Sequence, residues 1–317
     1  MPLTPPMIRT LYQAFLAMAL SSTTLCAGSA STGTSAWNKT TFLNEAAWSS
    51  RQGEIMAIVS EVRCRLLYLG AADGSLNLLS APSPRPIPTT SIPAPNWGGH
   101  RFWLGPQKRW VWPPISDWEF APASSVRAKG AVLIMEHLCT DKNYPALTRE
   151  YAWEGTRIRC TVRWKDDGRA YYGMHVIAID VPAEIPVLLK RTEDRPLGLV
   201  FVEMNGCKTE GFLPHPAFRD AGGKGTLVSG SPKSFKCGLA PQPLRVARAG
   251  GWTLTAHPGP TEGATIGSSD AGYLSQIWVG DSHATFAELE QISPILLGDD
   301  SGKCSSTCYI EATAPGK

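Results

Sequence analysis

The chain has 317 residues and a net charge of +3, with its 30 basic and 27 acidic residues interspersed along the sequence. This balance lacks the electrostatic footprint of a nucleic-acid-binding protein, so it argues against such a partner and favours a small neutral ligand. The 11 tryptophans are numerous enough to serve both core packing and contacts with sugar rings.

The N-terminus has the pattern of a secretory signal peptide. Arg9 precedes an apolar run over residues 11–20, and small residues follow that run. The run is about half of the roughly 20 apolar residues that a membrane-spanning helix needs, so we expect no stable membrane span. We predict that residues 1–30 are a cleaved leader and that the protein is periplasmic or secreted.

Small residues at Ala27 and Ala30 allow cleavage after either position. Cys26 raises a lipoprotein as the less favoured alternative, because Leu25 before it is not small.

After the leader, short β-like runs are separated by Gly, Pro, Asn and Asp, and long amphipathic helices are missing. This spacing is typical of an all-β sandwich or barrel. We predict one large antiparallel β-sandwich over residues 50–312, preceded by an N-terminal segment 31–49 and followed by a tail 313–317. The predicted strands span residues 54–62, 65–69, 132–138, 147–153, 157–164, 172–179, 197–203, 252–256, 273–279 and 285–292.

Turn residues refine this pattern in three places. Glu154-Gly155 and Asp167-Gly168 predict that residues 147–175 form three successive antiparallel strands. The Pro/Ser-rich stretch 81–95 and the Gly/Pro/Lys-rich stretch 222–243 predict loops that hold no strand ladder. Either loop borders a cleft or is a surface excursion.

Eight cysteines are present, and all but Cys26 lie after the leader. An exported protein can form disulfides, whereas no C-x-x-C pair or nearby histidine cluster indicates a metal site. Connectivity cannot be deduced from sequence, so other pairings stay open. Local pairing predicts Cys139 with Cys160, Cys207 with Cys237 and Cys304 with Cys308, leaving Cys64 free.

Two segments carry a family resemblance. Residues 96–117 read NWGGHRFWLGPQKRWVWPPISD, which combines a Gly-Gly pair, a polar residue, Arg101, aromatic residues and Pro-Gln with a later Trp-Pro element. Residues 286–294 read FAELEQISP. With Asp180-Val181-Pro182 between them, these segments resemble the landmarks of domain-of-unknown-function family 4380 over residues 50–312.

The resemblance implies a galactose mutarotase-like supersandwich, a fold shared by aldose 1-epimerases, although a fold alone assigns no activity. In the mutarotase mechanism a carboxylate takes the proton of the anomeric hydroxyl and a histidine protonates the ring oxygen, without a metal or other cofactor. By this resemblance Glu290 is the candidate base. His100 and His175 occur in the order of the two mutarotase histidines, which makes His175 the candidate acid.

Each of these residues also has a structural interpretation. Strand alternation puts His175 on one face with Ile177, which favours a hydrogen-bonded core histidine over a catalytic one. The two-residue spacing of Glu288 and Glu290 puts both carboxylates on one face, where they need a cationic partner such as Arg101. A structural ion pair and a ligand site explain this spacing equally well.

The candidate ligand-binding residues are polar or aromatic side chains of the landmark segments and of the strand end between them: His100, Arg101, Trp103, Gln107, Asp180 and Glu288. Tryptophans around the first landmark could form a stacking platform, although core packing is expected for most of them: Trp97, Trp103, Trp110, Trp112 and Trp118.

Three functions from different classes follow. The first is a monomeric carbohydrate-binding protein, the second is a metal-independent aldose 1-epimerase-like isomerase, and the third is a non-catalytic structural or assembly protein of the cell envelope. A glycosidase that uses Glu290 and Asp180 stays open. Asp166-Asp167 indicates a hairpin tip instead of a glycosidase pair, because adjacent side chains diverge.

Overall fold

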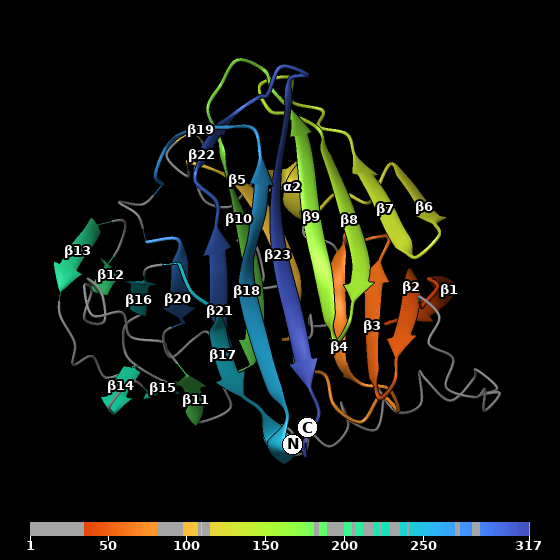
Figure 1. The fold of residues 1–317 in the computed structure, drawn as a ribbon, viewed down its shortest axis with the longest axis vertical. Coiled ribbons are helices and arrows are strands. Elements are labelled where there is room, and N and C mark those ends of the chain that lie inside the picture. Colours follow the sequence, from red (N-terminus) through yellow and green to blue (C-terminus); the bar gives the residue numbers. More distant parts are fainter. Residues whose placement is uncertain are drawn as a thin grey trace, which may run out of the picture.

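The computed structural model describes residues 35–80, 98–106, 109, 115–180, 241–269, 273–280 and 286–316 and, between 184 and 239, the strands alone. These residues form two large antiparallel sheets that pack face to face (Figure 1). The prediction of an all-β antiparallel sandwich is confirmed.

The larger sheet, called the large sheet below, has 11 strands among the described residues. Their order across the sheet is β1 (Asn38–Phe42), β2 (Glu45–Gln52), β3 (Ile55–Ser60), β4 (Arg65–Ala71), β5 (His100–Gly105), β10 (Tyr172–Asp180), β21 (Phe286–Ile292), β20 (Ser275–Val279), β16 (Phe235–Leu239), β12 (Val200–Met204) and β13 (Cys207–Gly211).

The second sheet has 10 described strands. Their order is β14 (Phe218–Ala221), β15 (Lys224–Val228), β11 (Glu184–Leu188), β17 (Leu244–Ala247), β18 (Thr253–Glu262), β23 (Lys303–Thr313), β9 (Arg157–Lys165), β8 (Leu147–Glu154), β7 (Val132–His137) and β6 (Ser125–Lys129). A short pair, β19 (Ala264–Gly267) and β22 (Ile295–Leu297), the helix α2 (Ser116–Glu119) and the 3₁₀ turn η2 (Ala249–Gly251) complete the described elements.

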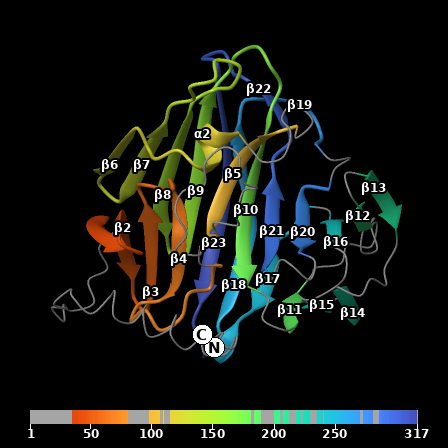
Figure 2. The same ribbon diagram turned by 180° about the vertical axis from the view of Figure 1, so that it is seen from behind.

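The main core lies between the sheets. Ile177 and Leu289 of the large sheet belong to one buried cluster with Ile158 and Ile310 of the second sheet. Because successive side chains of a strand point to opposite faces, each strand of the large sheet has an inner face toward this core and an outer face away from it. Figure 2 shows the large sheet from its outer side, with β5, β10 and β21 at its centre.

The prediction for residues 147–175 is correct for its first hairpin and wrong for its third strand. β8 and β9 pair around Gly155, whose φ of 62° fits a turn that favours glycine. β10, however, crosses to the large sheet and pairs with β5 and β21. Its side chains are buried from Tyr172 to Ile179, because a central strand has neighbours on both sides and its inner face meets the core.

Strands also occur outside the ranges expected from the sequence. The stretch 222–243 does hold strands, β15 and β16, because β16 finds backbone partners in β20 and β12 that are distant in sequence. The large sheet begins with β1, N-terminal to the domain start expected at residue 50. The stretch 81–95 and the leader lie outside the described residues.

The cysteine pairing predicted from sequence is wrong where the structure describes it. Cys64, Cys139, Cys160, Cys304 and Cys308 are free thiols, as was predicted for Cys64 alone. Residues four apart along one strand are about 13 Å from each other, too far for the Cα atoms of a disulfide, so Cys304 and Cys308 cannot pair within β23. Instead, Cys308 lies directly opposite Cys160 of β9. The side chains of Cys207 and Cys237 are outside the described part.

Candidate functional site

Strand alternation divides the two landmark segments between the faces of the large sheet. In β5, Arg101 and Trp103 point outward; in β21, Glu288 and Glu290 do so. The register confirms this division, because Val176 of β10 lies opposite both Arg101 and Glu290.

The outward-facing charges form ion pairs with one another. A guanidinium nitrogen of Arg101 donates to Oε1 of Glu288. Nζ of Lys236 in β16 lies 2.9 Å from Oε2 of Glu290. The register also places Trp278 of β20 opposite both Lys236 and Glu288. These five residues are called the outer-face cluster below.

Two members of the cluster, Lys236 and Trp278, were not expected from the sequence. Lys236 lies in the stretch that was predicted to hold no strand. Trp278 was inside a predicted strand, and only the pairing of β20 with β21 shows that it lies beside Glu288.

Burial perturbs one acid of the cluster. Desolvation raises the pKa of Glu288 to about 7; the guanidinium of Arg101 opposes this rise, and the neighbouring Glu290 carboxylate adds to it. The carboxyl group of Glu288 therefore changes protonation near neutral pH.

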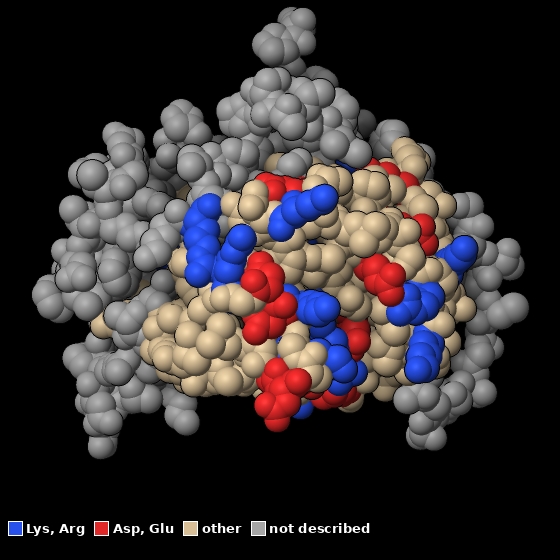
Figure 3. Space-filling view, turned by 90° about the horizontal axis from the view of Figure 1, so that it is seen from above, with Lys and Arg blue, Asp and Glu red and all other residues tan. Residues whose placement is uncertain are grey.

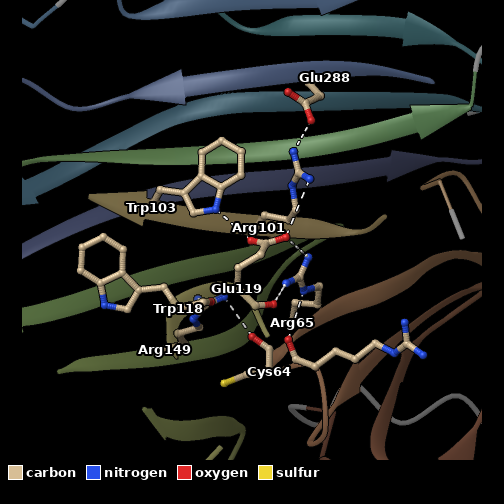
Figure 4. A network of polar contacts seen from close by, with 9 residues as sticks. Cys64, Arg65, Arg101, Trp103, Trp118, Glu119, Arg149 and Glu288 are labelled. Atoms are coloured by element: carbon tan, nitrogen blue, oxygen red, sulfur yellow. Dashed lines mark hydrogen bonds and ion pairs between the residues drawn. The ribbon is translucent and has the colours of Figure 1, made fainter. Parts of the chain in front are cut away.

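Arg101 also belongs to a second buried network, which is centred on Glu119 and includes Arg65 and Trp103 (Figure 4). β4 and β5 share one register pair, Leu66 with His100, and α2 contacts β5 beyond this point. Glu119 at the end of α2 binds Nη1 of Arg65 at 3.1 Å and lies 3.8 Å from Nη1 of Arg101. Although burial opposes them, these two guanidinium groups hold the pKa of Glu119 below its ordinary value.

Trp103, predicted to bind ligand, belongs to this network. Its Nε1 donates to Glu119 at 2.8 Å, and the guanidinium of Arg101 lies 4.6 Å from its ring centroid. With 3% of its surface exposed, the indole supports Arg101 and belongs to a second buried cluster that also contains Trp118. Trp118 is also buried and donates to the carbonyl oxygen of Pro145.

The two histidines lie on the inner face. Nε2 of His100 is 3.0 Å from Nδ1 of His175, whose Nε2 is 3.1 Å from Oγ of Ser306 in the second sheet. Burial lowers the pKa of His175 to about 3 and holds that of His100 well below its usual value. Both rings are therefore neutral at pH 7 and sit in the core.

The structure thus separates the predicted acid from the predicted base. His175 faces the inter-sheet core and Glu290 faces outward, so the sheet itself lies between them and they cannot act on one sugar. The prediction of a joint Glu290–His175 site, and of His100 as a ligand contact beside Arg101, is corrected on this ground.

The remaining candidates divide by position. Asp180 ends β10 opposite Phe286 and is exposed on the outer face. Gln107 and three tryptophans lie outside the described residues: Trp97, Trp110 and Trp112.

The described surface carries charges of both signs (Figure 3). On the face seen from above, acidic and basic side chains intermingle without a patch of one sign (Figure 3). Within the described ranges no group of three or more His, Cys, Asp or Glu is placed to hold a metal ion. No helix in those ranges is long and apolar enough to cross a membrane.

Solved structures with this architecture share very little sequence with the chain. A candidate aldose 1-epimerase from Escherichia coli K12 is 9% identical with a TM-score of 0.57, covering 84% of this chain and 99% of its own. A galactose mutarotase-like protein from Lactobacillus casei is 11% identical with a TM-score of 0.54, covering 84% and 100%. The fold is galactose mutarotase-like. A candidate mutarotase from Salmonella typhimurium, 11% identical with a TM-score of 0.54, covers 97% of this chain and 99% of its own.

At these identities the likeness establishes the fold alone. No family model matches the chain, and no curated protein matches it in sequence. Membership of domain-of-unknown-function family 4380 stays a prediction.

Proposed function

We propose that this protein binds a carbohydrate at the outer-face cluster. The observation that carries the proposal is the pair of outward-facing carboxylates, Glu288 and Glu290, held between Arg101 and Lys236 beside Trp278. Carboxylates accept hydrogen bonds from hydroxyl groups, and the two cationic side chains donate them. This combination suits a polyhydroxylated ligand, and the mutarotase-like fold supports the same class.

Export is part of this proposal. The N-terminal pattern supports a leader over residues 1–30, with the mature protein acting as a monomer in the periplasm or outside the cell. A sugar-binding protein there meets its ligand without a transport step.

An aldose 1-epimerase is the second candidate, because one specific observation favours it. Ring opening needs one base and one acid, and a carboxyl group with a pKa of about 7 can donate a proton at neutral pH. In this reading Glu290 takes the proton of the anomeric hydroxyl and protonated Glu288 gives one to the ring oxygen. Glu288 then replaces His175 in the predicted chemistry.

A thermal-shift screen of the purified mature protein against mono- and oligosaccharides tests binding, since a ligand that prefers the folded state raises the melting temperature. NMR then follows anomer exchange for each sugar that binds. Glu290→Gln should reduce the shift, whereas Glu136→Gln, which alters an exposed ion pair on the second sheet, should not.

The outcomes separate the functions. Anomer exchange that depends on both Glu288 and Glu290 selects the epimerase, and binding without exchange selects recognition. If no sugar raises the melting temperature and Arg101→Ala unfolds the protein, the cluster is structural, and this result favours the third function, a structural or assembly protein.

A further inference from the structure

Side-chain exposure within the outer-face cluster increases from Arg101 in β5 toward Lys236 in β16. Arg101 and the side chain of Glu290 are each 3% exposed, the side chain of Glu288 is 10% exposed and that of Lys236 is 18% exposed. Trp278 is half-buried as well. Within the cluster, the side chains most accessible to solvent are therefore those of Trp278 and Lys236, with Glu288 next to them.

Trp278 is placed as a platform at this entrance. It lies between Lys236 and Glu288 in one row across three strands, where directly opposite residues have Cα atoms about 5 Å apart. The half-buried ring of Phe286 packs against it, with ring centroids 5.1 Å apart and planes tilted by 45°. A supported, partly exposed indole beside hydrogen-bonding groups can stack on the apolar face of a sugar ring.

The charges of the cluster limit the class of sugar. Arg101 is paired with Glu288, Lys236 with Glu290, and Arg65 behind them with Glu119. When Glu288 is ionised, each of these carboxylates has a cationic partner. A charged sugar would bring an unpaired charge into a largely buried site, which costs more than its hydrogen bonds return.

We infer that Trp278 stacks on a neutral pyranose whose hydroxyl groups reach Glu288 and Lys236, and that acidic and amino sugars are rejected. This inference rests on the proposed function and names its ligand class and a residue that determines it. The uncharged ring keeps all three ion pairs intact.

Affinities of the full mature protein for four probes test the inference: D-glucose and D-galactose as neutral sugars, D-galacturonate as an acidic sugar and D-galactosamine as an amino sugar. We expect at least one neutral probe to bind and the two charged probes to bind at least about tenfold more weakly, which corresponds to about 1.4 kcal/mol. Tighter binding of galacturonate or galactosamine overturns the inference.

Variants test the platform. Trp278→Ala should lower the affinity for the neutral sugar by about tenfold. Trp278→Phe keeps an aromatic face and should therefore retain most of the wild-type affinity. Tyr309→Ala is the matched control, because Tyr309 is a half-buried aromatic residue on the outer face of the second sheet. Titration of the tryptophan fluorescence should show a sugar-dependent change in wild type that Trp278→Phe lacks.

The results distinguish this inference from the proposed function. If a sugar binds and both Trp278 variants bind it like wild type, the stacking role is wrong and the carbohydrate-binding function stands. If wild type binds none of a broad sugar panel, the proposed function fails and this inference fails with it.

Discussion

His175 and Glu290 lie on adjacent strands and point to opposite faces of the same sheet. Glu290 is directly opposite Val176, so its side chain shares the outer face with that of Val176, and the preceding residue, His175, points inward. His175 consequently contacts His100 and Ser306 in the core, whereas Glu290 contacts Lys236.

His175 should matter for stability and not for sugar binding. His175→Ala removes the hydrogen-bond partner of His100 and Ser306 in a buried site, which should cost about 1–3 kcal/mol of unfolding free energy. Urea unfolding measures this loss, and sugar affinity of the folded variant should equal that of wild type. A folded His175 variant that loses affinity would contradict the placement.

The buried histidine also predicts a dependence of stability on pH. Because the pKa of His175 falls from its usual 6.5 to about 3 on folding, the unfolded chain binds the proton more strongly. Stability from this group is therefore complete above pH 6.5 and declines as the pH falls toward 3, by up to about 4 kcal/mol. Urea midpoints from pH 7 to pH 3 should fall less steeply in His175→Gln than in wild type.

The stability contributed by Glu288 depends on pH in the opposite direction. Its pKa rises from 4.5 to about 7 on folding, so the folded state binds the proton more strongly. Its contribution to the free energy of unfolding, about 3 kcal/mol, is fully present below pH 4.5 and is lost as the pH rises through 7. Glu288→Gln should abolish this part of the pH dependence, and an unchanged profile between pH 4.5 and 7 would show that the carboxyl is not desolvated.

Glu119 should be the costliest single charge to remove among these acids. Glu119→Gln leaves the guanidinium groups of Arg65 and Arg101 buried without their shared carboxylate, which should cost about 3–5 kcal/mol. The control Glu136→Gln breaks an exposed pair with Arg127 and should cost less than about 1 kcal/mol. Equal losses in urea unfolding would show that the Glu119 network contributes no more than a surface pair.

The described cysteines should remain reduced and unreactive in the native protein. Burial raises the pKa of Cys64 and of Cys304 to about 11, which removes the reactive thiolate at pH 7. Native protein treated with an alkylating reagent should show both cysteines unmodified by mass spectrometry. After unfolding in urea, both should be alkylated without any added reductant. Detection of a Cys304–Cys308 disulfide would contradict this prediction and the strand geometry on which it rests.

Local patterns predicted much of the fold. All ten strands expected from turn residues and apolar runs coincide with strands of the structure, because a strand in a sandwich is short and bounded by residues that favour turns. The spacing of Glu288 and Glu290 likewise predicted that both point to one face, where they need a cationic partner. The first landmark segment supplied Arg101 as the candidate, and it pairs with Glu288.

Other features depended on which strands become neighbours. Lys236 and Trp278 belong to the cluster because β16 pairs with β20 and β20 pairs with β21. β10 does not continue the β8–β9 hairpin, because it pairs with β5 and β21 in the large sheet. Sequence alternation by itself determined which residues of one strand share a face. Only the tertiary structure decided which face meets the second sheet, because that choice is made by long-range strand pairing and burial, and it placed His175 in the core and Glu290 in the candidate site.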